Sequence, residues 1–385
     1  MKTNPSSASI VCREVSGRRG RRKFFDLERR IYQDDPNWVA PLWGEKKLLC
    51  GFGKHPFYED AESKAFLAER DGVPVGRVVA IINHAHNRQH DERRGFFGFF
   101  ECIDDVDVAR TVFDRASAWL EEKGMTAIRG PVNPGLNYEC GLLVDGFDSP
   151  PTFLISYNRP YYGSLIEACG FEQCQDMFCY ESSIDDLESL DPKLKFVIDE
   201  ATRRFKVSCR PIDPKRFDED VKIFLDIYNQ SLQRTWGYVP MSDQELKHQA
   251  KQLKLLIVPE LTSIAEIKGK PVGAGFGLLD FNQILHTMNG KLFPFGWLKL
   301  LRDKRKIDRL RLVSTNVLPE YQSWGLGLVT LNRIVPDAIE FGIKTGEFSW
   351  VLESNQLSRG TIERGGATKV KTQRIYDREI STPSG

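Results

Sequence analysis

The spacing of hydrophobic residues predicts strands and helices in regular alternation along the first half of the chain. Val108, Val112, Ala116 and Leu120 recur at helical spacing, which is typical of an amphipathic helix. Asp71-Gly72 between two apolar runs indicates a hairpin turn. The predicted helices cover 24–32, 104–123 and 158–169, the strands cover 65–70, 75–82, 95–102, 126–129 and 172–181, and a Gly/Pro/Asn-rich loop covers 130–151.

The same pattern begins again near residue 185. Residues 68–76 match residues 265–273 at six of nine positions, and Asn158 and Asn355 share the same offset of 197 residues. A constant offset indicates duplication, so we expect two domains, 1–185 and 186–385. The second copy has predicted strands at 207–212, 263–267, 272–279, 310–318, 348–353 and 370–376, and helices at 216–235, 243–256, 329–341 and 356–364. This order predicts an α+β fold, with a mixed sheet covered by helices on both faces.

A glycine loop, residues 321–328, lies between a predicted strand and a predicted helix in the second copy. Gly325 and Gly327 let the backbone bend and approach a ligand closely. The unpaired amides at a helix start carry partial positive charge. The loop is therefore predicted to hold a phosphate group.

Composition and charge narrow the classes of partner. The chain has 54 Lys and Arg against 53 Asp and Glu, which gives no global field for nucleic acid or membrane. No apolar run approaches the roughly 20 residues that span a bilayer, and the N-terminal residues show no secretory signal pattern. We expect a cytoplasmic protein without nucleic-acid or membrane partners. The eight scattered cysteines form no CxxC pair, so we expect reduced, mostly buried thiols and no metal.

The order of elements around Gln322-x-x-Gly325-x-Gly327 resembles the Gcn5-related N-acetyltransferase (GNAT) superfamily. In that superfamily the loop amides hold the pyrophosphate of acetyl-CoA, and an Asn-started helix after the next strand also contacts CoA. The resemblance covers about residues 205–380 with the motif intact, and the whole chain resembles tandem-GNAT proteins. It implies an acetyl-CoA or other short acyl-CoA site formed by Val317, Leu318, Gln322, Ser323, Trp324, Gly325, Leu326, Gly327 and Asn355.

Three of these positions carry further expectations. The resemblance implies that a backbone amide near Val317 or Leu318 holds the oxyanion of the tetrahedral intermediate. Trp324 either lines the slot for the pantetheine arm of CoA or packs against the sheet edge.

The first copy differs at the corresponding loop. Residues 101–107 read Glu-Cys-Ile-Asp-Asp-Val-Asp, without glycine. Aspartates suit a helix start, but they occupy the place of a pyrophosphate, and like charges in a partly dry site repel strongly. We expect that the first copy has lost CoA binding and serves as structure or as a wall of the acceptor pocket.

The catalytic groups are less clearly marked. Acyl transfer needs a base for the amine and can use an acid for the leaving thiolate. Glu353 and Glu320 are the candidate bases, although both also suit solvated strand ends. The tyrosine that the superfamily often uses as the acid is replaced by Ile362, and Tyr376 is the candidate substitute. His286 is a weaker candidate base, because it also suits a satisfied polar position.

Two segments are candidates for binding the acceptor or the nucleotide end of CoA. In the first copy, Asn133, Asn137, Tyr138 and Glu139 are candidate acceptor contacts, although turn formation also explains this loop. The second copy has an insertion between Asp280 and Arg309. Its part 299–311 holds seven basic and two acidic residues and is either a solvated face or a clamp for the 3′-phosphate of CoA. Residues 293–297 are a candidate apolar lid or interdomain contact.

The resemblance implies an acyl-CoA-dependent N-acyltransferase, with acetyl transfer to the amine of a small molecule or peptide bound between the two domains. Two alternatives remain: a non-catalytic CoA-binding or scaffold protein, favoured by the missing tyrosine, and a Fem-type peptidyltransferase with another donor. The glycine loop argues against the second. The sequence leaves the oligomeric state open, with a homodimer as one option.

Overall fold

The computed structural model describes residues 9–291 and 296–380, and the chain divides into two compact units. Unit 1 contains residues 1–150, 156–176 and 373–385, and unit 2 contains residues 151–155 and 177–372. Each unit therefore takes a segment from the other half of the sequence. The predicted division at 185/186 stays a prediction for the limits of the duplicated halves.

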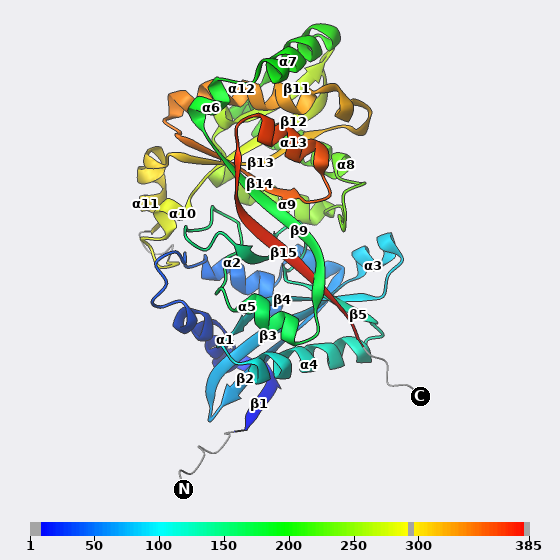
Figure 1. Ribbon diagram of the computed structural model, residues 1–385, viewed down its shortest axis with the longest axis vertical. Helices are drawn as coiled ribbons and strands as arrows, with labels where there is room; N and C mark the ends of the chain where they lie inside the picture. Colours follow the sequence, from blue (N-terminus) through cyan, green and yellow to red (C-terminus); the bar gives the residue numbers. More distant parts are fainter. Residues whose placement is uncertain (1–8, 292–295, 381–385) are drawn as a thin grey trace. The chain divides into compact units, whose positions relative to one another are not determined.

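Unit 1 is built on a mixed sheet in the order β1-β2-β3-β4-β5, which ends on the last residues of β15. Neighbouring strands are antiparallel except β4 and β5, which are parallel. Its elements are β1 (Ile10–Glu14), α1 (Gly17–Ile31), α2 (Trp43–Lys47), β2 (Ala61–Arg70), β3 (Val73–Asn83), α3 (His84–His90), β4 (Arg94–Cys102), α4 (Val106–Glu122), β5 (Ala127–Gly130), β6 (Val132–Asn133), β7 (Glu139–Cys140), β8 (Leu142–Asp145), α5 (Tyr162–Ala168) and the first part of β9 (Glu172–Ser183) (Figure 1).

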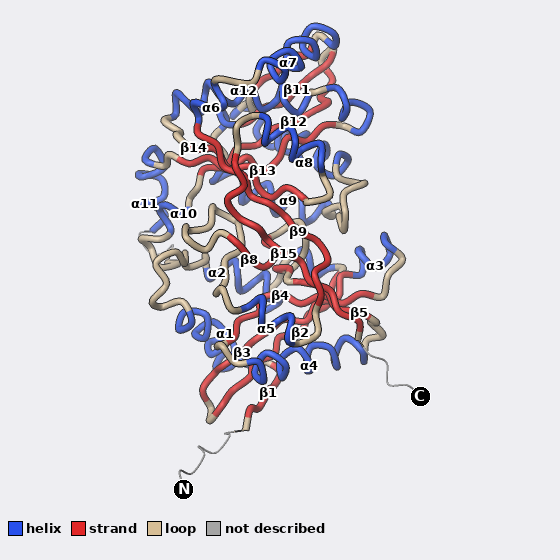
Figure 2. Tube along the Cα trace, viewed as in Figure 1, coloured by secondary structure: helices blue, strands red, loops and turns tan. Residues whose placement is uncertain are grey.

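Unit 2 repeats this arrangement with the order β10-β11-β12-β13-β14-β9, in which only β13 and β14 are parallel. Figure 2 shows the two sets of strands and the helices around them. The elements are α6 (Ile184–Glu188), α7 (Pro192–Phe205), β10 (Val207–Arg210), α8 (Phe217–Ser231), α9 (Asp243–Leu256), β11 (Thr262–Ile267), β12 (Lys270–Leu279), α10 (Asn282–Leu285), α11 (Gly296–Asp303), β13 (Arg309–Val317), α12 (Leu326–Phe341), β14 (Thr345–Leu352), α13 (Gln356–Arg364) and β15 (Thr368–Glu379).

The duplicated hairpins agree down to an irregularity in their pairing. The register between β2 and β3 shifts at Ala68/Glu69, and the register between β11 and β12 shifts at Ala265/Glu266. Both turns have two residues with positive φ, Asp71-Gly72 and Lys268-Gly269, as a two-residue hairpin turn requires. The predicted hairpins are confirmed.

Helices cover both faces of the unit 2 sheet, as predicted. A Cβ at Gly275 would lie 3.3 Å from Ile334 of α12, whereas the next residue, Phe276, packs its ring 5.4 Å from Phe224 of α8. Successive residues of a strand point to opposite faces, so α12 and α8 lie on opposite faces. The glycine lets α12 approach the sheet closely.

Some short elements were not predicted. Helix α7 begins after the N-cap Asp191 with Pro192 and buries Leu194 and Ile198, but no helix was expected there. The segment 130–151 was expected to be a loop, whereas it carries β6, β7 and β8. The lid expected at 293–297 lies mostly outside the described residues.

Candidate functional site

Strands β13 and β14 separate partway along their length. They pair from Arg309↔Thr345 to Leu312↔Phe348, but β13 continues to Val317 and β14 continues to Leu352. Beyond Leu312 the two strands are no longer paired with each other, so this strand pair does not use their facing backbone groups. The opening is a V between the fourth and fifth strands of the repeat.

The amides at the end of β13 point in two directions. Leu318 donates its amide proton to the carbonyl of Val272, 2.9 Å away, on the neighbouring β12. Because amides alternate along a strand, the amide of Val317 points toward the opening. Of the two candidates for the oxyanion contact, Val317 therefore has the suitable orientation, whereas the amide of Leu318 is already used by the sheet.

The glycine loop follows β13 directly. Residues Pro319–Trp324 form a 3₁₀ turn, Gly325 is left-handed with φ 76°, and α12 starts at Leu326. No side chain of the described residues caps this helix, and its first turn has no acidic residue. The positive end of a helix of 16 residues thus lies at the end of the opening, which suits an anion.

The loop side chains hold the loop in place. Gln322 donates from Nε2 to the carbonyl of Val317 at 3.2 Å and to that of Ser231 at 2.9 Å. Trp324 packs edge-on against Phe205 of α7 at 4.8 Å, with the guanidinium of Arg204 4.5 Å from its ring centre. Of the two readings of Trp324, this contact favours packing, although its partner is α7 and not the sheet edge.

The glycines of the loop differ in their surroundings. A Cβ at Gly325 would lie 2.5 Å from a methyl group of Val197 in α7. A Cβ at Gly327 would make only ordinary contacts with Thr315 of β13, from 3.5 Å. The neighbouring Leu326 is buried, whereas Ser323 is exposed.

The matching helix start in unit 1 is filled by a carboxylate. Asp105 caps α4 by accepting from the amides of Asp107 at 3.0 Å and Val108 at 3.3 Å. Its other oxygen accepts from Arg70 at 2.6 Å. These hydrogen bonds and the charge of Arg70 outweigh the effect of partial burial and lower the pKa of Asp105. The amides that would bind a phosphate are already occupied by this aspartate.

The opening of unit 1 is also filled. Strands β4 and β5 pair only from Arg94 to Phe96, and the chain then places β6 against β4. The Phe99 amide donates to Oδ1 of Asn133 at 2.7 Å, and a Cβ at Gly98 would lie 1.8 Å from the Val132 carbonyl. In unit 1 the chain itself thus lies beside β4, at the place where the corresponding strands of unit 2 are no longer paired. The loss of CoA binding by the first copy remains a proposal, which this filling supports.

The other candidate acceptor contacts also lie in unit 1. Glu139 belongs to the short strand β7, and the ring of Tyr138 packs 5.8 Å from Phe57. Asn137 is part of the turn before β7 and is partly exposed. The packing of Tyr138 is typical of a structural residue, and the role of all four residues in acceptor binding stays a prediction.

The candidate catalytic residues lie in both units. Glu320 and Glu353 are exposed residues of unit 2, next to the ends of β13 and β14 respectively. Tyr376 belongs to the hydrophobic core of unit 1, where its hydroxyl lies 3.0 Å from Glu167. This is the placement of a core tyrosine.

Asn355 caps α13 by accepting from the Ser358 amide at 3.1 Å.

Two buried polar clusters were not predicted. In unit 1, Arg77 donates to Glu28 at 2.6 Å and lies 3.6 Å from Glu101, which accepts from Tyr162 at 2.7 Å. Burial, followed by the charge of Glu28, raises the pKa of Glu101 to about 7. The sequence signal was a charged residue, Arg77, inside the apolar run of β3.

The second cluster lies at the closed end of the unit 2 opening. Arg311 donates from Nε to Ser349 at 2.9 Å, and Ser349 donates to Glu347 at 2.5 Å. Thr152 also donates to Glu347. Arg311 and Glu347 are register partners in β13 and β14, so this cluster ties the two strands together just before they separate.

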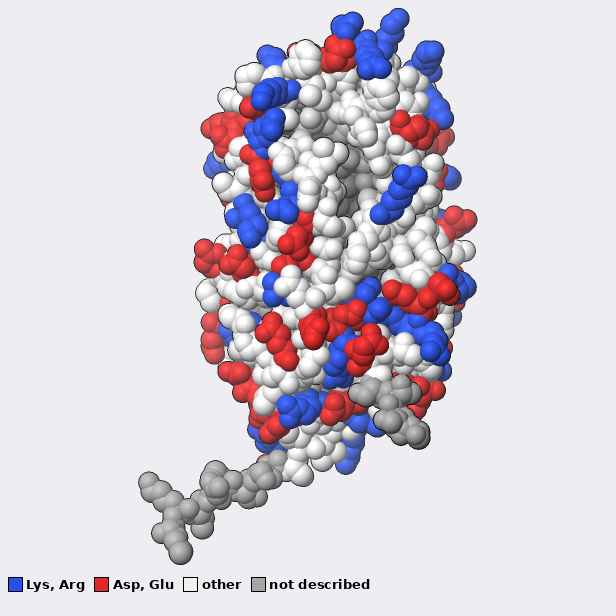
Figure 3. Space-filling view, turned by 45° about the vertical axis from the view of Figure 1, so that its right-hand side comes forward, with Lys and Arg blue, Asp and Glu red and all other residues white. Residues whose placement is uncertain are grey.

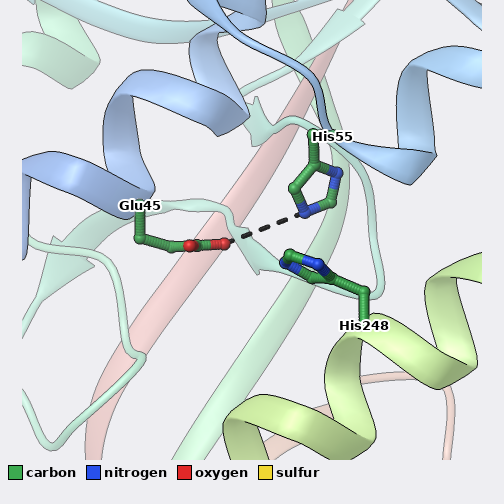
Figure 4. Close-up of side chains that lie close together, drawn as sticks. All are labelled: Glu45, His55 and His248. Carbon is green, nitrogen blue, oxygen red and sulfur yellow. Dashed lines mark ion pairs between the residues drawn. The ribbon is translucent and has the colours of Figure 1, made fainter.

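His55 and Glu45 of unit 1 lie next to each other, with His55 Nε2 3.8 Å from a Glu45 oxygen (Figure 4). His55 accepts the Phe57 amide proton on Nδ1 at 3.2 Å, which places its own proton on Nε2, toward the carboxylate.

Charge is mixed on the surface. On the face shown in Figure 3, Lys and Arg alternate with Asp and Glu without a continuous field of one sign. The eight cysteines are free thiols and mostly buried, as expected. No helix within residues 9–291 and 296–380 is long and apolar enough to cross a bilayer.

Comparison with solved structures identifies the fold. A tandem GNAT protein from the clavulanic acid biosynthesis pathway superposes with a TM-score of 0.57 at 10% identity, covering 98% of this chain and 100% of that chain. A GCN5-related N-acetyltransferase from Sphaerobacter thermophilus gives a TM-score of 0.54 at 12% identity, covering 97% and 96%. The chain is a tandem GNAT-fold protein, in agreement with the predicted fold class.

Sequence comparison finds relatives with higher identity than these solved structures. Protein YghO of Escherichia coli is 33% identical over 98% of this chain and 97% of its own length. The bacterial ceramide synthase of Caulobacter vibrioides is 33% identical over 93% of this chain and 94% of its own length. No protein-family model matches the chain. The chain belongs to the same family as these two proteins.

Proposed function

We propose that the chain is an acyl-CoA-dependent N-acyltransferase whose acceptor is the amine of a long-chain amino alcohol. The observation that carries the proposal is the contrast between the repeats. In unit 2 the strands β13 and β14 diverge and α12 starts without a cap, whereas in unit 1 the same places hold Asn133 and Asp105. The relative named bacterial ceramide synthase supports the acceptor, because a ceramide is the fatty amide of such an amino alcohol.

In this proposal the donor thioester lies in the opening of unit 2. The pyrophosphate of CoA binds the amides at the start of α12, and the Val317 amide holds the thioester oxygen. The amine nitrogen attacks the carbonyl carbon, the carbon–sulfur bond breaks, and the products are an amide and free CoA thiol. Glu353 or Glu320 takes the amine proton, directly or through water, and the departing thiolate takes a proton from water to give the free thiol. The proposed donor is a fatty acyl-CoA, whereas the sequence led us to expect acetyl-CoA or another short acyl-CoA.

A pair of substitutions at Gly327 tests the proposed phosphate site at the start of α12. Gly327→Asp puts a carboxylate in the first turn of α12, as Asp107 is in α4, while Gly327→Ala adds only a methyl group. We expect Gly327→Asp to weaken acyl-CoA binding at least about tenfold by charge repulsion. The same change should leave the melting temperature equal or higher, because an acid suits a helix N-terminus. The measurement is calorimetric titration of the full chain with acyl-CoA. Equal affinity of both variants would refute a phosphate site at the start of α12.

The acceptor is tested separately by activity. The full chain is supplied with acetyl-CoA or palmitoyl-CoA and with a long-chain 2-amino-1,3-diol, and amide and free thiol are measured together. We expect both products in equal amounts with the longer donor. Binding of acyl-CoA without thiol release for any amine would instead favour the non-catalytic alternative, in which Ile362 marks the loss of the proton donor.

A further inference from the structure

Helix α11 of unit 2 exposes its apolar side. Trp297, Leu298 and Leu301 are 42%, 47% and 60% exposed, and their spacing places them on one side of the helix. By contrast, Asp303 on the same helix is only 6% exposed. An amphipathic helix of a soluble protein normally turns its apolar side inward, whereas α11 presents these three apolar side chains to solvent and buries an aspartate.

Basic residues in and directly after α11 make ion pairs within the segment and contacts with other elements of unit 2. Arg302 and Lys306 each lie 3.0 Å from Asp303 and keep 74% and 75% of their side chains exposed. Lys304 donates to the Ile257 carbonyl at 3.3 Å, and Arg305 lies 4.6 Å from the ring centre of Phe341. Lys304 and Arg305, directly after α11, thus fix the segment to unit 2, while the exposed apolar side chains and two cationic groups point to solvent.

We propose that α11 binds the surface of an anionic lipid bilayer, lying in the plane of the interface. Tryptophan and leucine insert at the level of the headgroups and acyl chains, and flanking Arg and Lys bind the headgroup phosphates. A nucleic acid would leave the two leucines in water, so the combination fits a lipid surface better. An interfacial helix does not cross the bilayer, so this proposal requires no membrane-spanning helix. The inference revises the expectation of no membrane partner and does not rest on the proposed acyl transfer.

Sedimentation with vesicles tests the proposal on the full chain without CoA. The vesicles are phosphatidylcholine alone or phosphatidylcholine mixed with phosphatidylglycerol. We expect binding to the mixed vesicles that weakens with salt, and a loss of at least about tenfold in partitioning for Leu298→Asp with Leu301→Asp. The matched control is Leu357→Asp on α13, whose side chain is 73% exposed, and it should bind like the native chain.

Three outcomes would overturn the proposal: no binding to the mixed vesicles, equal binding by the double variant, or equal binding to both vesicle types. Sedimentation velocity supplies a further one. If the native chain self-associates without binding vesicles, and the double variant stays monomeric, the surface joins two copies of the chain instead. Circular dichroism checks that the variant is folded, and Leu298→Ser with Leu301→Ser replaces it if it is not.

Discussion

Gly325 and Gly327 are both part of the loop motif, but the backbone constrains only one of them. Gly325 has φ 76°, and its added Cβ would meet Val197. Gly327 lies inside the first turn of α12, with room for a methyl group. The sequence identified both as one motif, because spacing alone does not report backbone angles or neighbours from another helix.

This difference predicts different costs of alanine. Gly325→Ala should lower the free energy of unfolding by about 1–2 kcal/mol, because a side chain with positive φ is strained. Gly327→Ala should change it by less than about 0.5 kcal/mol or raise it, since alanine favours helix. Urea unfolding followed by circular dichroism measures both. If both substitutions lowered the free energy of unfolding equally, the left-handed backbone at Gly325 would not be what makes glycine necessary in the loop.

Glu101 predicts a pH dependence of stability in unit 1. Its pKa is raised from 4.5 to about 7 by burial, so the folded protein holds a proton that the unfolded chain releases. Its contribution to stability is complete below the unfolded pKa and is lost as the pH rises through about 7. Glu101→Gln keeps the neutral form, so the loss of stability between about pH 5 and about pH 8 should become smaller.

The measurement is urea unfolding at several pH values. Glu92 is a useful contrast. Partial burial raises its pKa, but the hydrogen bonds from Arg94 and His86 outweigh this effect and lower the pKa to about 2. Glu92→Gln should therefore remove a contribution that is present above the unfolded pKa and lost on acidification. An unchanged pH profile in Glu101→Gln would mean that Glu101 is ionised throughout.

At the scale of elements, the sequence predicts what depends on local pattern. The duplicated hairpins follow from Asp71-Gly72 and Lys268-Gly269 between apolar runs, and the structure confirms them. Helix α7 was missed although Asp191-Pro192 and the spacing of Leu194 and Ile198 mark it. The separation of β13 from β14 could not be predicted, because pairing between strands distant in sequence leaves no local pattern.

The hydrogen bond between Asn133 and β4 in unit 1 predicts that substitutions of Asn133 lower the stability of the protein. Its Oδ1 is the acceptor for the amide of Phe99, a residue that is 4% exposed. Asn133→Ala should cost about 1–3 kcal/mol of unfolding free energy, since a buried donor loses its partner. Asn133→Asp keeps an acceptor oxygen and should cost less. Thermal unfolding of both variants measures the difference, and a larger loss in the aspartate variant would contradict this account.

At the scale of the whole molecule, the two compact units do not correspond to a single cut in the sequence. The end of β15, from Tyr376 to Glu379, pairs with β5 in unit 1. In unit 2, β14 pairs with Met177–Ser183 of β9. The sequence showed the duplication, but not this exchange, because a repeat pattern reports the type of each element and not its partner.

The exchange predicts that the halves 1–185 and 186–385 do not fold as separate fragments. The first half lacks Tyr376 of its own core and the strand that pairs with β5. The second half lacks the partner strand of β14. Each fragment would leave an unpaired strand edge and exposed apolar surface, which favours aggregation.

Expression of each half alone should therefore give insoluble or unfolded protein, and expression of both halves in one cell should give a soluble pair. The control is the full chain with a protease site inserted in the loop and 3₁₀ turn at 211–216. The chain folds before it is cut, and the cut divides no strand, so the two pieces should stay together. Soluble, cooperatively melting separate halves would contradict the exchange. A deletion of residues 373–385 should melt with a loss of structure in unit 1, because the removed segment supplies the last strand of its sheet and Tyr376.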